Sequence, residues 1–120
     1  MMKKLTIAAL ILFLAASVIF AQQQRFRNGN VTAQGVSYNE ATGMANGSLT
    51  VRVTFRGNRI TEIVVTEHTD SAPFLAMASS QVIPAIIRAQ STEVDNVSGA
   101  TWTSIGIREA VAAAMAQARR

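Results

Sequence analysis

Hydrophobic and polar residues alternate strictly along residues 48–56. This period of two predicts a half-buried strand with one face in solvent. Gly57-Asn58 follows and marks a tight turn, and residues 59–66 form a second run that is rich in β-branched residues. We therefore expect an antiparallel hairpin over about residues 48–66. The apolar members of its first strand are Leu49, Val51, Val53 and Phe55.

Downstream of the hairpin the pattern changes to helical spacing. Pro73 suits the first turn of a helix over about residues 73–80. Pro84 is disfavoured inside a helix, so we expect a break and a second short helix over about residues 83–90. A last helix is expected over about residues 103–118. The order of strands and then helices indicates an α+β fold, a small antiparallel sheet packed by C-terminal helices.

The start of the chain has a pattern of its own. Two lysines precede an apolar run that ends at Ala21, which is typical of a secretory signal peptide. Ile19 is larger than the residue favoured before a cleavage site, so an uncleaved N-terminal anchor over residues 1–21 is the alternative. Residues 22–36 are polar without a period, and we expect a flexible lead-in there. A single folded domain is expected over residues 37–120.

Composition narrows the classes of function. The chain has no cysteine and one histidine, which excludes disulfides, thiol catalysis and Cys-based metal sites and gives no His cluster for a metal. Without the two N-terminal lysines, the chain has nine arginines and seven acidic residues, which gives a net charge of +2. The arginines are scattered and form no basic stripe with aromatic residues between them, so nucleic acid is not an expected partner. No acid–base pair is evident, and no catalytic residue is assigned.

The stretch from Asp95 to Ser104 carries the candidate chemistry. It predicts a tight loop that leads into the last helix, where unpaired backbone N–H groups and the helix dipole favour an anion. Gly99 lets the backbone turn, Ala100 adds little bulk, and the Thr101 hydroxyl is open to approach. Asp95 is placed to accept hydrogen bonds from the loop or to assist a modifying enzyme. The simpler reading is a helix capped by Thr103 or Ser104 after an ordinary turn.

This stretch resembles a known acceptor motif. The run Asp95-Asn96-Val97-Ser98-Gly99-Ala100-Thr101 is similar to the Asp-x-x-Ser/Thr-Gly-Ala-Ser/Thr motif of the FMN-binding domain family, which includes subunits of the sodium-pumping NADH:quinone reductase and the Rnf complex. Trp102 followed by Thr103-Ser104 also fits the family pattern, as does Gln90 upstream. The segment from His68 to Ser71 resembles the family's His-x-Glu-Thr pattern, with Asp70 and Ser71 in place of Glu and Thr.

The resemblance implies a cofactor and its site. In the family, a periplasmic flavin transferase cleaves FAD and esterifies FMN through its phosphate to the last hydroxyl of the motif, here Thr101. The expected cofactor-binding residues are Thr101, Ser98, Gly99, Ala100, Thr103, Ser104, Asp95, His68 and Trp102. His68 is either a donor facing the flavin or a surface residue at a strand end. Trp102 either stacks on the flavin ring or anchors the core, while Phe74 and Met77 are expected in the core.

The implied function is electron transfer outside the cytoplasm, in the periplasm or at the outer face of the cytoplasmic membrane. The partners would be the flavin transferase and membrane or soluble redox proteins. Such a domain is an electron carrier or an oxidoreductase component, with turnover of a small substrate less expected in so short a chain. The alternatives are a non-redox exported module that binds an anionic ligand without a covalent bond, and a small extracytoplasmic reductase component.

Overall fold

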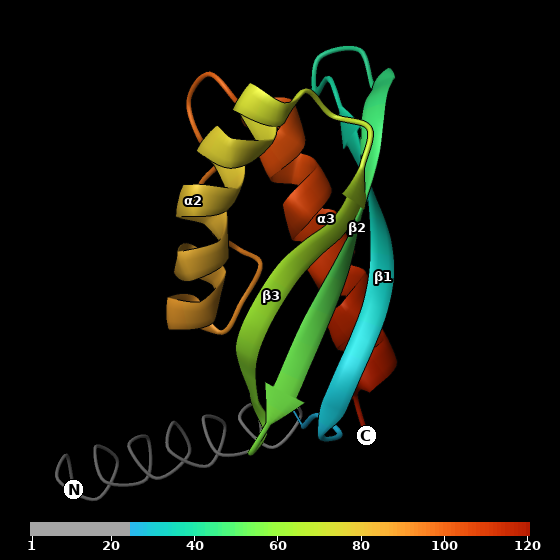
Figure 1. Ribbon diagram of the computed structural model, residues 1–120, viewed down its shortest axis with the longest axis vertical. Coiled ribbons are helices and arrows are strands. Elements are labelled where there is room, and N and C mark those ends of the chain that lie inside the picture. The colour runs from blue at the N-terminus through green and yellow to red at the C-terminus, as the bar shows by residue number, and fades with distance from the viewer. Residues whose placement is uncertain (1–24) are drawn as a thin grey trace, which may run out of the picture.

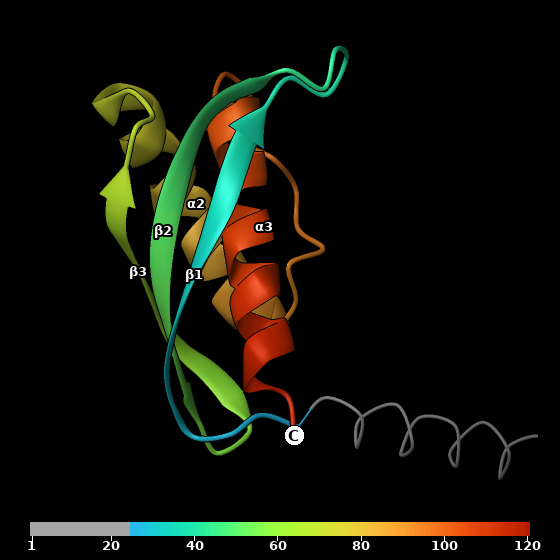
Figure 2. The same ribbon diagram turned by 90° about the vertical axis from the view of Figure 1, so that its right-hand side faces the viewer.

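The computed structural model describes residues 25–120, so the signal or anchor predicted over residues 1–21 lies outside the described residues. Three strands form one antiparallel sheet in the order β1-β2-β3, and two helices lie against one of its faces (Figures 1 and 2). The strands are β1 (Gly29–Tyr38), β2 (Ala45–Arg56) and β3 (Arg59–His68), and the helices are α2 (Ala72–Ala89) and α3 (Thr101–Ala118). The α+β fold and the hairpin of β2 and β3 are confirmed.

Strand β1 corrects the expectation of a flexible lead-in. Its residues 29–36 fall within the segment predicted to be unstructured, yet they pair with β2 along their length. The inward-facing residues of β1 are the partly buried Val31 and the buried Ala33, Gly35 and Ser37. They alternate with a period of two, but three of the four are too small to give a hydrophobic signal. These three are small because α3 lies directly on them: a Cβ added at Gly35 would collide with the backbone carbonyl oxygen of Gly106.

Helix α2 also differs from the prediction. Residues 72–89 form one continuous helix with Pro84 inside it, where two short helices separated by a break were predicted. Proline removes only the bond to the carbonyl of Ser80, and both Ser80 and Pro84 are exposed, so water can take the place of the lost donor. By length and composition α2 is apolar enough to cross a membrane, but its buried residues belong to the domain core.

Helix α3 covers β1 and β2 and closes the core. Its buried face packs against the alternating apolar residues of β2, each of which is at most 2% exposed. The other face of β2 carries Arg52 and Arg56, which are exposed as expected for the solvent side of the hairpin. Burial of this kind contributes about 1.5–3 kcal/mol for each large aliphatic or aromatic side chain. The packed apolar residues of α3 include Ile107, Val111, Ala114 and Met115.

The two ends of the described chain meet at one end of the domain. Phe26 bridges to Arg119, and the N–H of Arg27 donates to the carbonyl of Ala118 at 2.8 Å. The N-terminus of α3 lies at the opposite end, beside the loop that enters α2 (Figure 1). Residue Thr101 is therefore held at the end of the domain that is distant from its termini.

Candidate functional site

The loop before α3 is held by the Ser104 side chain. Its hydroxyl accepts a hydrogen bond from the Val97 N–H at 3.0 Å and donates one to the Ala100 carbonyl at 2.7 Å. The Ala100 N–H in turn donates to the Val97 carbonyl at 2.9 Å. Val97, Ala100 and Ser104 are all buried. These bonds fix the path of the backbone, and Gly99 at the turn has a φ of 88°, in the left-handed region that favours glycine.

Helix α3 begins earlier than predicted. Thr101 is its first residue and Ala100 is the N-cap, with no side-chain cap hydrogen bond. The predicted caps, Thr103 and Ser104, are instead buried inside the first turn. Ser104 supports the loop from within the helix, and Thr103 donates to Asp70 Oδ2 at 2.7 Å. The helix can start at Thr101 because these two hydroxyls already tie it to the loop and to the segment before α2.

The first turn of α3 presents three unpaired donors. The N–H groups of Thr101, Trp102 and Thr103 have no acceptor one turn earlier in the helix. None of the hydrogen bonds among residues 25–120 uses them. Together with the positive end of the helix dipole, they favour a negatively charged group at this point. The Thr101 side chain, which is half-buried, lies beside them.

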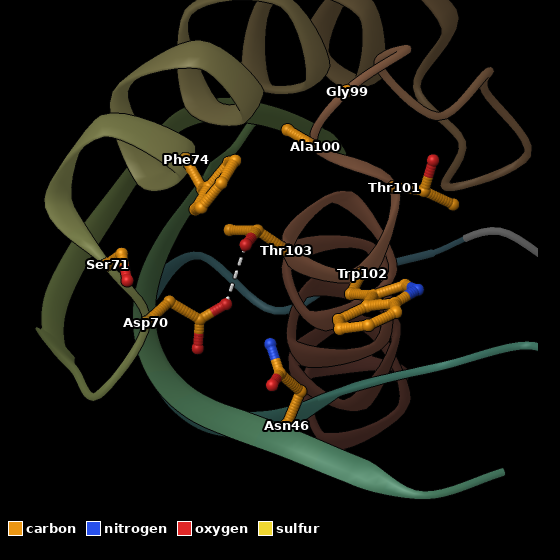
Figure 3. Close-up of a pocket in the computed structure, with 9 residues that line it drawn as sticks. All are labelled: Asn46, Asp70, Ser71, Phe74, Gly99, Ala100, Thr101, Trp102 and Thr103. Carbon is orange, nitrogen blue, oxygen red and sulfur yellow. Dashed lines mark hydrogen bonds between the residues drawn. The ribbon is translucent and has the colours of Figure 1, made fainter. Parts of the chain in front are cut away.

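An open pocket of about 530 Å³ lies next to this turn. Its volume is in the usual range for a small-molecule site. Figure 3 shows Phe74 and Asp70 on one side of the pocket and the Trp102 ring on the other, with Asn46 below them and the Thr101 side chain at the edge, directed away from the others. Phe74 is 49% exposed and Trp102 is 39% exposed. The full lining is Asn46, Asp70, Ser71, Phe74, Gly99, Ala100, Thr101, Trp102 and Thr103.

Five of the predicted site residues line this pocket and four do not. Gly99, Ala100, Thr101, Trp102 and Thr103 are in the lining. Of the other four, Ser104 is buried behind the loop. The remaining three residues, Ser98, Asp95 and His68, lie elsewhere on the surface.

Ser98 and Asp95 line a different depression, between the loop and α2. Both side chains are exposed. Asp95 therefore lies outside the pocket and is accessible to a protein that approaches the loop.

His68 lies at the end of β3, exposed to solvent. Its Nδ1 is 2.8 Å from the carbonyl oxygen of Asp70, so Nδ1 carries the donated hydrogen. The ring supports the turn into α2 and does not line the pocket. His68 is thus a surface residue at a strand end, and a contact with the flavin stays a prediction.

Several pocket residues were not expected from the sequence. Phe74 and Met77 were predicted in the core, but Met77 is 42% exposed and Phe74 is in the pocket lining. Trp102 does not anchor the core either. A Cβ at Gly99 would lie 3.7 Å from Met77 Sδ, so Met77 borders the same turn. The clustering of Phe74, Met77 and Trp102 depends on the packing of α2 beside α3, which the sequence pattern alone does not give.

Asp70 is the polar centre of the site. It is 8% exposed, and its Oδ2 accepts hydrogen bonds at 2.7 Å from Ser37 on β1 and from Thr103 on α3. A signal for this residue was present, because Asp70 occupies the position of an acidic residue in the family pattern quoted above. Its burial between three elements required the structure.

Gln90 holds the other end of α2 to the sheet. Its side chain accepts from the Ile60 N–H at 2.7 Å and donates to the Ile60 carbonyl at 3.0 Å. Gln90 itself has a φ of 53° and ends the helix. It acts on the fold rather than on the pocket, from which it is separated by the length of α2.

Comparison with known proteins agrees with this geometry. The model of the FMN-binding domain family matches residues 45–116. A protein of Treponema pallidum (strain Nichols), described as uncharacterized, is 47% identical over 66 residues, which cover 55% of this chain. The chain spans 18% of the length of that relative. The family match includes β2, β3, both helices and the loop at Thr101, and it supports a flavin-binding module. The chain belongs to the FMN-binding domain family.

Proposed function

We propose that this protein is an exported electron-transfer domain that carries FMN in phosphoester linkage to Thr101. The observation that carries the proposal is the position of the Thr101 hydroxyl. It lies at the rim of the pocket, on the first residue of α3 and beside three unpaired N–H groups. A phosphate joined to this oxygen would meet donors and a positive dipole end without any movement of the backbone.

The residues of the pocket fit the parts of FMN. The exposed rings of Phe74 and Trp102 provide apolar faces for a flat aromatic system. The unpaired N–H groups suit the phosphate, and Asn46 and Asp70 are polar residues in the same lining. Both apolar and anionic portions of the cofactor therefore have a matching surface.

Attachment would be a transfer reaction at the Thr101 oxygen. That oxygen forms a bond to the FMN phosphorus of FAD, the pyrophosphate bond breaks, and AMP leaves while the hydroxyl proton passes to a base. The chain offers no base beside Thr101 among its described residues: Asp70 is tied to Ser37 and Thr103, and Asp95 lies outside the pocket. A separate flavin transferase is the proposed partner for this step.

FMN would supply one- and two-electron chemistry. The residues of this chain would orient the ring between Phe74 and Trp102 and shield part of it from water. The pocket is open to the surface, so an edge of the ring would stay accessible to membrane or soluble redox partners. No described residue forms a nucleophile–base pair in the lining, which favours a carrier over an enzyme that turns over a small substrate.

The placement of the ends is compatible with a location at a membrane. The Arg120 N–H donates to the carbonyl of Arg25, the first described residue, at 3.1 Å, so Arg25 lies beside the C-terminus, and the N-terminus of α3 lies at the opposite end (Figure 1). If the apolar run that ends at Ala21 anchors the protein on the outer face of the cytoplasmic membrane, the flavin would face away from the bilayer. If the run is removed as a signal peptide, the same domain would act in the periplasm.

Two other functions use the same features. The unpaired N–H groups and the pocket would also suit a module that binds an anionic ligand without a covalent bond and without redox chemistry. The exposed rings beside the pocket would equally suit a small extracytoplasmic reductase component that passes electrons directly to a terminal acceptor. The non-covalent module would lose its ligand when the protein is denatured. The reductase component would differ from the leading proposal in the acceptor that the reduced protein reacts with.

Flavin fluorescence on a denaturing gel separates covalent attachment from the non-covalent module. The protein is produced with and without a flavin transferase, denatured, and illuminated in the gel. Fluorescence that requires the transferase, disappears in Thr101→Ala and is retained in Thr101→Ser would support the covalent carrier. Thr103→Ala is the matched control, because it removes a hydroxyl two residues away. A dark wild-type band would count against covalent attachment and favour the non-covalent module.

A further inference from the structure

Asp70 has an oxygen that the protein leaves without a partner. The residue connects β3 to α2 and is buried beneath the pocket. Oδ2 accepts two short hydrogen bonds, but Oδ1 has no hydrogen-bond partner among residues 25–120. Burial of a carboxylate oxygen without a donor is costly. The protein therefore compensates the charge of this carboxylate only through Oδ2.

Oδ1 is buried against β2, next to the pocket that Asp70 lines, and has less than 1 Å² of accessible surface. A Cβ at Gly47 on β2 would collide with Oδ1, so the glycine leaves the room that this oxygen occupies. Figure 3 shows one Asp70 oxygen directed at Thr103 and the other directed away from it. Asp70 is the one titratable side chain among the lining residues. Its two hydroxyl bonds, from β1 and α3, hold it in a single orientation.

We propose that the buried carboxylate of Asp70, whose Oδ1 has no hydrogen-bond donor among residues 25–120, lowers the reduction potential of a flavin bound in the pocket through its negative charge. The inference rests on the proposed function. Reduction adds electrons to the cofactor, and a fixed negative charge in a pocket of low dielectric opposes this addition. Ser37 and Thr103 act as positioning residues, because they hold the carboxylate by binding Oδ2.

The direct test is the midpoint potential of the flavin in Asp70→Asn. Asparagine has the shape of aspartate, and its carbonyl oxygen can still accept from Ser37 and Thr103, while its amide replaces Oδ1 with a donor. The potential should shift to a more positive value, and the flavin absorption bands should move. Glu62→Gln is the matched control, because it removes the charge of an exposed carboxylate outside the pocket lining, and its potential should equal that of the wild type.

A loaded Asp70→Asn protein whose potential and spectrum match those of the wild type would overturn the proposal, even if its thermal stability were lower. A purely structural Asp70 would affect stability without moving the potential. This outcome differs from failure of the proposed function, in which the wild-type protein itself takes up no flavin. Intact mass and the flavin spectrum, recorded first on the wild type, distinguish the two cases.

A second measurement does not depend on folding of the variant. The whole chain contains two aspartates, Asp70 and Asp95, so wild-type protein labelled with ¹³C at the aspartate carboxyl gives two resonances. A soluble paramagnetic agent should broaden the signal of exposed Asp95 and spare that of buried Asp70. The spared signal should shift when the flavin is reduced. A spared signal that is identical in the oxidised and reduced proteins would overturn the proposal.

Discussion

Replacement of Ser104 by alanine tests how the loop at Thr101 is held. The substitution removes the acceptor of the buried Val97 N–H and one of two donors to the Ala100 carbonyl. The second loss is mild, because the Ser104 backbone N–H still donates to that carbonyl at 3.0 Å. The loss of the acceptor leaves the buried Val97 N–H unsatisfied, which costs about 1–3 kcal/mol. The higher helix propensity of alanine recovers roughly half a kcal/mol.

We therefore expect the free energy of unfolding to fall by about 2 kcal/mol in Ser104→Ala. For a domain of this size that corresponds to a decrease in Tm of roughly 8–16 °C. Urea and thermal unfolding of the flavin-free protein, followed by circular dichroism, measure both quantities. Ser98→Ala is the control, because Ser98 is exposed in the same loop and its change should stay within about 0.5 kcal/mol. Equal stability of the two variants would refute the role given to Ser104.

Gly106→Ala should lower the free energy of unfolding by about 1–3 kcal/mol in urea titration, because its Cβ would collide with Ser37 on β1. Gln90→Glu should cost a similar amount, about 1–3 kcal/mol, since a carboxylate cannot donate to the Ile60 and Ile87 carbonyls; unchanged stability would contradict this. The charge of Glu109 and its hydrogen bond raise the pKa of Tyr38 above its usual 10.0. Glu109→Gln should lower the pKa of Tyr38 in ultraviolet titration of the flavin-free protein, where Tyr38 is the single tyrosine. Because this pKa is raised in the folded state, the contribution of Tyr38 to the stability of the fold is fully present below pH 10. It is lost as the pH rises from 10 through the folded-state pKa.

The parts of the fold that the sequence predicts are those with bulky residues in a regular pattern. The β2–β3 hairpin follows from the alternation at Leu49 to Phe55, and α3 follows from its helical spacing. Strand β1 could not be found in this way, because most of its inward residues are small. Their size is set by the close approach of α3 at Gly106, a tertiary contact that leaves no hydrophobic pattern in β1.

Local rules also misplaced the helix boundaries. Pro84 normally ends a helix, but here the bond it removes lies on the exposed side of α2, and burial of the opposite face keeps the helix continuous. Thr103 and Ser104 have the residue types of helix caps. They are buried because Asp70 and the Val97–Ala100 turn bind their hydroxyls, and these partners cannot be identified from neighbouring residues alone.

The sequence predicts the Thr101 end of the candidate site but not its full surface. Thr101 was identified from a local run of residues, and the structure places it at the rim of the pocket. Phe74, Asn46 and Asp70 come to the pocket from α2, β2 and the segment between β3 and α2. Their meeting depends on how the two helices pack on the sheet, so a linear motif carries little information about them.

The attachment of flavin at Thr101 can be measured directly by mass spectrometry of a tryptic peptide. Cleavage after Arg88 and Arg108 yields residues 89–108, which contain the whole loop. After production with a flavin transferase, this peptide should carry the mass of FMN less one water, and fragmentation should place it on Thr101. An unmodified peptide from protein produced with an active transferase, or a modification placed on another hydroxyl of the loop, would contradict the proposed function.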